Sequence, residues 1–370
     1  LDFDVTEQLS LSLEGRYQEE KKGLTERDNG PGTPSYDNAA KATDFIPKAI
    51  VSYDMNNGGS VYGSYARGIK PGGINGPIGV ETNNETYLPE TSNSFEIGYK
   101  TRTGDGKGQI TLAAFFNDIS RYQLTTPVQA AGSTAINSVA TNQGNAEIMG
   151  FEFEGFYDIS DNLTLGGTYA YTDAEFTSGC DDFQFTLNSG GYLISPFDQG
   201  NPPSVGTIRG SADPNNPTLD PDGLFTGNLS CSIAGNKIPM TSEHQASVYS
   251  RFEMPVNESM DFFTNLDLTY ESSKFIQVHN GMETGGATLL GGQIGVKFDN
   301  LRMEIFGRNI LNERTPPIAT RWFDLFEGFN TFSSSTPGAT SIDRNPTGPR
   351  SALLSFRRGS QFGVRVKADF

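Results

Sequence analysis

Residues 145–176 decide the fold: NAEIMGFEFEGFYDISDNLTLGGTYAYTDAEF. Between residues 149 and 157 every second position is apolar, aromatic or glycine, and the intervening positions are mostly polar. A short polar turn at 160–162 follows, and the alternation resumes over 163–172. Successive side chains of a strand point to opposite faces of a sheet. The stretch therefore predicts a hairpin with one apolar, aromatic face and one polar face.

The length of the two arms separates membrane barrels from soluble sandwiches. Strands of globular proteins mostly run about 5–6 residues, whereas these arms run about ten to fifteen. Long arms joined by a tight turn at one end and a long loop at the other are typical of a membrane-spanning β-barrel.

The rest of the chain repeats this unit, giving about twelve strands and a remnant at residues 1–4. Short turns such as NNGG at 56–59 are strong hairpin signals. They alternate with long polar loops, as turns inside and loops outside do in a bacterial outer membrane. We expect one all-β domain over 1–370, a transmembrane antiparallel β-barrel. Its expected extracellular loops are about 23–43, 71–89, 125–143, 177–241, 277–286 and 313–359.

The composition excludes a helical membrane protein and argues against a nucleic-acid-binding protein. Of the 370 residues 35% are hydrophobic, and no apolar run approaches the roughly 18–20 residues of a helical span. A barrel escapes that test because only alternate residues face lipid. The net charge of −17 argues against a nucleic-acid partner.

The polar faces of the predicted strands carry repeated charges. A charge facing lipid costs up to about 2–4 kcal/mol at the midplane. Seven side chains are therefore expected to face a wide lumen that holds water or a polar plug: Glu152, Glu154, Arg251, Glu253, Asp267, Arg302 and Glu304. The alternative is the solvated outer face of a soluble sheet.

Cys180 and Cys231 both fall in the expected loop 177–241. A pair in one exposed loop predicts a disulfide formed in an oxidising compartment, with two free thiols as the alternative. No CxxC pattern and no neighbouring histidine accompany them, so we expect no metal there. Leu1–Asp4 has no signal-peptide character and reads as the end of a strand.

Several motifs, in this order and spacing, resemble the C-terminal barrel portion of TonB-dependent outer-membrane receptors. They are YGSYARGIKPGG at 62–73, PETSNSFEIGYK at 89–100, NQG at 142–144 with GFE at 150–152, YAYTDA at 169–174, GRNILNE at 307–313 and FGVRVKADF at 362–370. The resemblance implies a 22-stranded barrel closed by an N-terminal plug, with a TonB box near the N-terminus. Neither the plug nor the box is found here, and counting back from the last strand makes residues 9–22 strand 11. Phe370 then ends the terminal aromatic strand that the barrel-assembly machinery reads.

The resemblance implies capture of a scarce solute at the cell surface and its import with energy from the TonB complex. Ligands of the family include siderophore–iron chelates, haem, cobalamin and oligosaccharides, and no enzymatic activity or cofactor is implied. Other expected partners are outer-membrane lipids or lipopolysaccharide and a surface lipoprotein. Candidate ligand contacts near the outer ends of strands are Arg67, Lys70, Arg121, Tyr122, His279, Arg308, Arg321 and Trp322. Ordinary girdle or loop packing is the alternative for each.

Other features of the loops are open to more than one interpretation. Asp213, Asp220 and Asp222 offer oxygen ligands for Ca²⁺, but the intervening prolines favour a solvated loop. Arg344 and Arg350 suit an anionic ligand or lipopolysaccharide phosphates. The competing functions for the whole chain are a complete 12-stranded passive channel, an outer-membrane enzyme, and a structural partner in a surface assembly.

Overall fold

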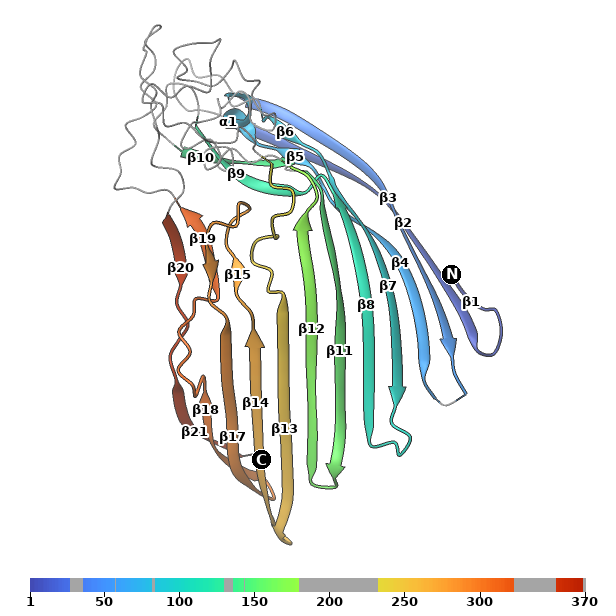
Figure 1. Cartoon of the computed structure of the whole chain (residues 1–370), viewed down its shortest axis with the longest axis vertical. Coiled ribbons are helices and arrows are strands. Elements are labelled where there is room, and N and C mark those ends of the chain that lie inside the picture. Colours follow the sequence, from blue (N-terminus) through green and yellow to red (C-terminus); the bar gives the residue numbers. More distant parts are fainter. Residues whose placement is uncertain are drawn as a thin grey trace.

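The computed structural model describes residues 1–26, 36–56, 58–81, 84–129, 136–142, 144–179, 232–322 and 351–368. One antiparallel sheet of 13 strands dominates this part of the chain (Figure 1). Its strands, in spatial order, are β1 (Asp2–Asp4), β2 (Leu9–Glu26), β3 (Tyr36–Asp54), β4 (Ser60–Lys70), β7 (Glu90–Arg102), β8 (Gly108–Ser120), β11 (Ala146–Ser160), β12 (Leu163–Phe176), β13 (His244–Asn257), β14 (Met260–Glu271), β17 (Ala287–Phe298), β18 (Leu301–Arg308) and β21 (Gln361–Ala368). Twelve long strands and the remnant β1 match the architecture expected from the sequence.

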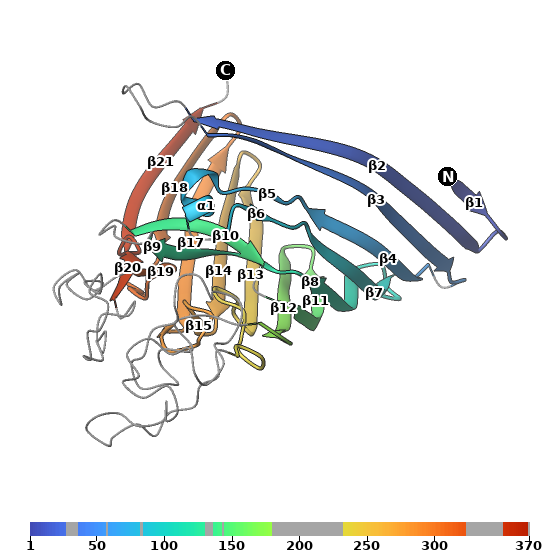
Figure 2. The ribbon, with the colours of Figure 1, turned by 90° about the horizontal axis from the view of Figure 1, so that it is seen from above.

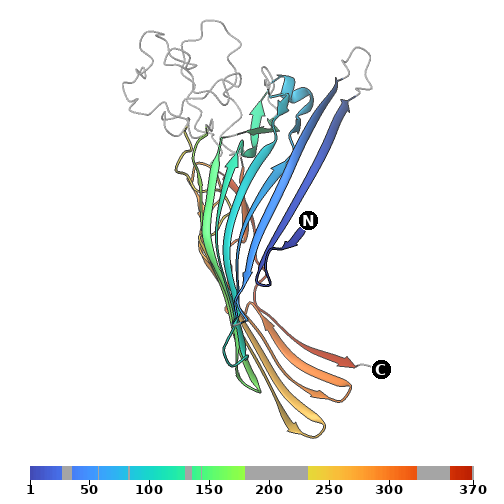
Figure 3. The ribbon, with the colours of Figure 1, turned by 90° about the vertical axis from the view of Figure 1, so that its right-hand side faces the viewer.

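The hairpin of residues 145–176 is confirmed as β11 and β12. Its register runs from Ala146 opposite Phe176 to Tyr157 opposite Leu165, with a bulge only at the turn. Short turns join the long strands at one end of the sheet, and the long connections gather at the other, which we call the upper end (Figures 1 and 3).

The long connections hold more regular structure than the sequence predicted. Paired strands occupy much of the connection expected at 23–43, since β2 reaches Glu26 and β3 begins at Tyr36. The sequence of this segment is polar and has no apolar alternation. The backbone pairing between the two strands nevertheless continues, because it does not require apolar side chains. Four two-stranded ribbons and one short helix occupy other expected loops: β5 (Gly73–Ile74) with β6 (Thr86–Tyr87), β9 (Gln123–Gln129) with β10 (Ile136–Asn142), β15 (Lys274–Phe275) with β16 (Glu283–Thr284), β19 (Ile318–Trp322) with β20 (Ser351–Ser355), and α1 (Gly76–Glu81).

The two faces of the sheet differ in character. On the face that we call apolar, large hydrophobic side chains stand exposed, including Phe151, Val248, Leu266, Ile294 and Ile305 at 46–58%. A continuous apolar band of this kind is unusual on a water-soluble protein. It is the surface that a barrel presents to lipid. No helix among the described residues is long and apolar enough to cross a membrane.

The sheet curls, and the small elements lie in its hollow. Figure 2 shows α1, β5, β6, β9 and β10 on the concave side of the long strands. The strands at the two ends of the sheet, β1 and β21, are not paired with each other. The curved wall is therefore open in this part of the chain.

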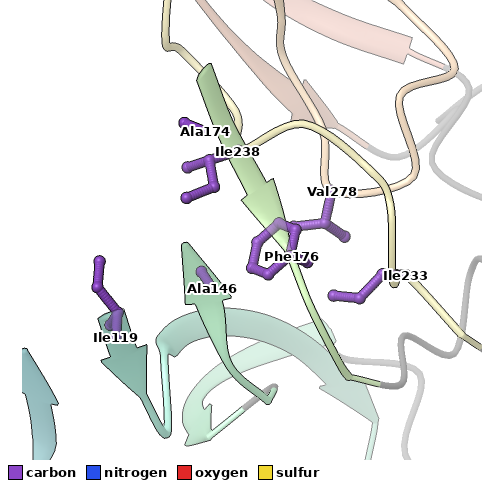
Figure 4. Packing of buried hydrophobic residues seen from close by; sticks show 7 residues of the cluster. All are labelled: Ile119, Ala146, Ala174, Phe176, Ile233, Ile238 and Val278. Carbon is purple, nitrogen blue, oxygen red and sulfur yellow. The ribbon is translucent and has the colours of Figure 1, made fainter. Parts of the chain in front are cut away.

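A small hydrophobic core sits at the upper end, on the face opposite the apolar band. Ile119, Ala146 and Phe176 are direct cross-strand partners on β8, β11 and β12. Ile233 and Val278 come from later connections and pack against them (Figure 4). This cluster, completed by Ala174 and Ile238, holds the later connections against the concave side of the wall.

Candidate functional site

The candidate site is the polar face of the sheet together with the elements at its upper end. All seven charged residues expected to face a lumen share this face. Directly paired residues point the same way, and the register links the four strands that carry these residues: β11, β13, β14 and β18.

Near the turn end of this face, charges and aromatic rings interlock. Glu304 is almost fully buried, and its carboxylate lies 2.9 Å from Arg302 Nε and 2.5 Å from Arg365 Nη1. The Arg302 guanidinium lies over the Phe263 ring, 4.0 Å from its centroid. Gly295, the cross-strand partner of Phe263 and Glu304, leaves room for that ring, because a Cβ there would come within 2.8 Å of Phe263 Cζ. Paired and stacked charges of this kind fix the wall of a polar interior.

The remaining charged residues lie higher or further along the wall. Lys297 Nζ lies 2.5 Å from Glu253 Oε1, and the Arg251 guanidinium lies 5.0 Å from the centroid of the Tyr249 ring. Glu152 and Glu154 have no hydrogen-bond partner among the residues that the structure describes. Two unpaired carboxylates are compatible with contact to water or to a polar plug, which stays a prediction.

The candidate ligand contacts do not form one cluster. Arg67 alternates with Tyr65 on the apolar face, where it lies opposite Asn93. The parity of β4 thus places Arg67 on the face opposite Lys70, and its ligand contact stays a prediction. Lys70 lies on the polar face, with Nζ 3.7 Å from Glu90 Oε2. Arg121 is exposed, with a left-handed backbone (φ 58°) just before β9.

Two of the candidates belong to packed structure. The Tyr122 ring packs edge-on against Phe176, with centroids 5.3 Å apart. Burial, with a contribution from the negative charge of Glu90, raises the pKa of its phenol. His279 is buried between β15 and β16. Both residues are thus part of packed structure, and their ligand contacts stay predictions.

The remaining candidates have different outcomes. Arg308 lies on the polar face, 5.5 Å from the centroid of the Phe306 ring. Arg321 and Trp322 lie on β19, opposite Ala352 and Ser351 of β20. Outside the described residues lie Cys180, Cys231, Phe370, the acidic loop of Asp213, Asp220 and Asp222, and Arg344 and Arg350.

Three amide side chains that sequence reasoning missed join two upper connections into one body. Gln123 Nε2 lies within 2.9–3.2 Å of the carbonyl oxygens of Lys70, Pro71 and Leu88. Asn75 exchanges two hydrogen bonds with the backbone of Ala140, both of 2.8 Å. We call β5, α1, β6, β9 and β10 the rim platform. The only signal in the sequence is the presence of asparagine and glutamine in the expected loops, which does not identify their partners.

The third amide, Asn142, completes the platform. Its side chain accepts a hydrogen bond from Leu88 N at 2.7 Å and donates to Leu88 O at 3.0 Å. The platform also contacts the wall, because Lys22 Nζ donates to Gly72 O at 3.1 Å. A cavity of about 280 Å³ lies at this junction, lined by residues that include Glu20, Lys22 and Tyr87. The platform therefore narrows the hollow of the sheet at its upper end.

Comparison with known proteins identifies the family. A family model described as "TonB dependent receptor-like, beta-barrel" matches residues 1–310. The chain belongs to this family. Members are receptors and transporters of the outer membrane, so the apolar band of this chain contacts outer-membrane lipid.

The chain is similar to two named receptors of this family. The probable TonB-dependent siderophore receptor PiuA of Acinetobacter baumannii is 30% identical over 145 residues, which is 38% of this chain and 18% of that protein. The ferric yersiniabactin uptake receptor FyuA from Yersinia pestis has a TM-score of 0.65 at 13% identity, covering 100% of this chain and 44% of that one. The crystal structure of PiuA has a TM-score of 0.58 at 16% identity, covering 98% and 41%. The chain thus spans less than half the length of these relatives.

Proposed function

We propose that this chain forms part of the wall of a receptor that imports a scarce polar ligand with energy from the TonB complex. A siderophore–iron chelate is the first candidate ligand; cobalamin or an oligosaccharide is the second. The observation that carries the proposal is the charged face running across β2 to β21 on the concave side, partly covered at its upper end by the rim platform. Such a surface suits a large hydrated solute.

The names of the relatives support iron chelates. FyuA is a ferric yersiniabactin uptake receptor and PiuA a siderophore receptor. The same fold also occurs in the copper transporter OprC, with a TM-score of 0.59, so the fold leaves the ligand class open.

A complete 12-stranded passive channel receives no support. A channel of that kind would need β21 to pair with a strand at the other end of the sheet, whereas the described sheet ends at β1 and β21. Open sheet edges do not occur in the hydrocarbon region of a membrane. Further strands are therefore expected to pair with these two edges.

Growth under iron limitation tests the proposal. A strain lacking the full-length gene and the same strain complemented with it are supplied with single ferric chelates, with cobalamin and oligosaccharides in parallel. We expect one chelate class to support growth only in the complemented strain. Equal growth of the two strains on every ligand would contradict the proposal, provided that immunoblots show the receptor in the outer membrane.

A further inference from the structure

On β2 and β3 the apolar band ends at a pair of aromatic side chains. The register carries the apolar face from Phe151 on β11 to Val51 on β3, and Phe45 and its cross-strand partner Tyr17 share that face. The two side chains are 58% and 70% exposed. Aromatic side chains are enriched where the hydrocarbon of a membrane meets the headgroups. This pair therefore marks the headgroup level at the upper end of these two strands.

Two lysines face each other just beyond this aromatic pair. Lys21 and Lys41 are direct cross-strand partners on the same face, four residues further towards the upper end. Like charges directly opposite each other destabilise a sheet. Glu19 holds the two ammonium groups together, with carboxylate oxygens 3.1 Å from Lys21 Nζ and 3.0 Å from Lys41 Nζ. Both lysine side chains remain more than half exposed, so a group outside the barrel can reach them.

The neighbouring strands β4 and β7 repeat this arrangement. Tyr65 and Phe95 are cross-strand partners on the apolar face, with ring centroids 5.2 Å apart. Arg67 follows two residues after Tyr65 on the same face. Its side chain is exposed and has no acceptor among the residues that the structure describes. Both pairs of strands thus place a cation beyond an aromatic pair, on the side that faces away from the hollow.

The positive charge is local to these strands. Beyond the aromatic pairs, the described residues of β2, β3 and β4 give the apolar face three cations and two carboxylates: Lys21, Lys41 and Arg67, with Glu19 and Asp37. Asp37 accepts a hydrogen bond from the Thr25 hydroxyl at 3.0 Å and lies four residues beyond Lys41, away from the band. On β8, β11 and β12 the same face is acidic and carries Asp118, Glu147, Asp173 and Glu175, of which the last two bind Lys237. An anionic headgroup therefore finds its complement on β2 to β4.

We propose that Lys21 and Lys41 bind a phosphate group of an outer-leaflet lipid, the lipopolysaccharide. A phosphate monoester carries a charge of about −1.5 to −2 at neutral pH, so it relieves the repulsion between two ammonium groups that share one carboxylate. The site continues the surface that contacts lipid, and the acyl chains of the same molecule would lie on the apolar band below it. A lipid is therefore favoured over a free anion. The inference goes beyond the proposed function, because it concerns the outer surface of the wall and not the imported ligand.

The test titrates the full-length receptor in detergent micelles with three probes and follows binding by native mass spectrometry. The probes are lipid A with both phosphates, the same lipid with its phosphates removed, and inorganic phosphate. We expect saturable binding of the phosphorylated lipid and about 10-fold weaker binding of the dephosphorylated one, as for the loss of a hydrogen bond to a charged group. Equal affinities of the two lipids would show that only the acyl chains bind. Inorganic phosphate that displaces the lipid at equal concentration would show a site for the free anion, and either result would overturn the proposal.

A matched pair of lysine variants assigns the effect to this site. Lys21→Gln should weaken binding of phosphorylated lipid A about 10-fold and leave the dephosphorylated lipid unchanged. Lys107→Gln removes the same charge from an exposed turn at the opposite end of the sheet and should preserve the discrimination between the two lipids. If the two variants behave alike, net charge controls lipid binding, and the proposal is wrong.

Glu19→Gln gives a change of opposite sign. This variant removes the carboxylate that competes with phosphate for the two ammonium groups, so the affinity for phosphorylated lipid A should rise several-fold while that for the dephosphorylated lipid stays the same. If Glu19, Lys21 and Lys41 formed only a surface ion-pair network, the affinity would stay the same or fall, and the proposal would be contradicted. Heat-sensitive gel mobility confirms that each variant is folded before the titration.

Discussion

Adjacent residues on β17 provide a sharp test of which face meets lipid. Ile294 is half-exposed on the apolar face, with Thr264 and Ile305 as cross-strand partners. Gln293 lies on the polar face, between Asn265 and Phe306. Both positions are near the middle of a strand of 12 residues. We compare Ile294→Lys with Gln293→Lys, because both variants introduce the same side chain at nearly the same depth in the membrane.

The expected difference follows from desolvation. A lysine facing lipid costs about 2–4 kcal/mol at the midplane, whereas a residue facing the interior mainly tunes selectivity. Since 1.4 kcal/mol is a factor of ten, Ile294→Lys should lower the folding equilibrium constant by about 30- to 1,000-fold. Gln293→Lys should stay within about 0.5–1 kcal/mol of wild type, helped by Asp267 and Glu304 on the same face.

The assay is urea-dependent folding of the full-length protein into phospholipid vesicles, followed by the heat-sensitive gel mobility of folded barrels. Ile294→Leu controls for loss of the native side chain. The face assignment would be refuted if Gln293→Lys cost as much as Ile294→Lys, or if the order were reversed.

Three further predictions concern the platform, a loop carboxylate and a wall glycine. Gln123→Glu replaces the donor that bonds three carbonyls, so limited proteolysis within 71–90 should become faster while the barrel still folds; an unchanged cleavage rate would show that Gln123 does not hold the platform. The Thr315 backbone N–H and hydroxyl lower the pKa of Glu313 from 4.5 to about 2, so this folded-state contact stabilises the loop above about pH 4.5 and is lost as the pH falls towards 2. Exchange of the Arg314 and Thr315 amides, corrected for intrinsic rates, should accelerate over that range in wild type and show no such transition in Glu313→Gln. Gly295→Ala would place a Cβ 2.2 Å from Met303 O and should cost about 1–3 kcal/mol, seen as a lower temperature for loss of gel mobility; Gly104→Ala, with open space around its Cβ, should have little effect.

The sequence predicted the wall well, because a barrel strand is encoded locally. Period-two alternation with turn signals at 56–59 and 160–162 was enough to place the long strands. Alternation also placed Glu152 and Glu304 on one face, since parity fixes the face of every residue in a regular strand. The same parity argument applied to β4 would have separated Arg67 from Lys70.

The upper end was not predictable in the same way, because contacts between distant segments shape it. The extension of β2 to Glu26 depends on pairing with β3. The sequence of this extension has no apolar alternation that would predict a strand. Tyr122 looks like an exposed rim residue until Phe176 is brought against it. Arg357 lies in an expected loop, and its partner Glu271 lies 86 residues away in the sequence. The sequence pattern gives no sign of this contact.

The most direct test of the central claim is the rate of ligand uptake in cells with and without TonB. Cells expressing the full-length receptor are supplied with the radioactive iron chelate that the growth assay selects, and uptake is followed over minutes in a wild-type and a TonB-deficient background. The account predicts binding at the surface in both backgrounds but accumulation only with TonB. Equal accumulation in the two would show passive passage and contradict energised import.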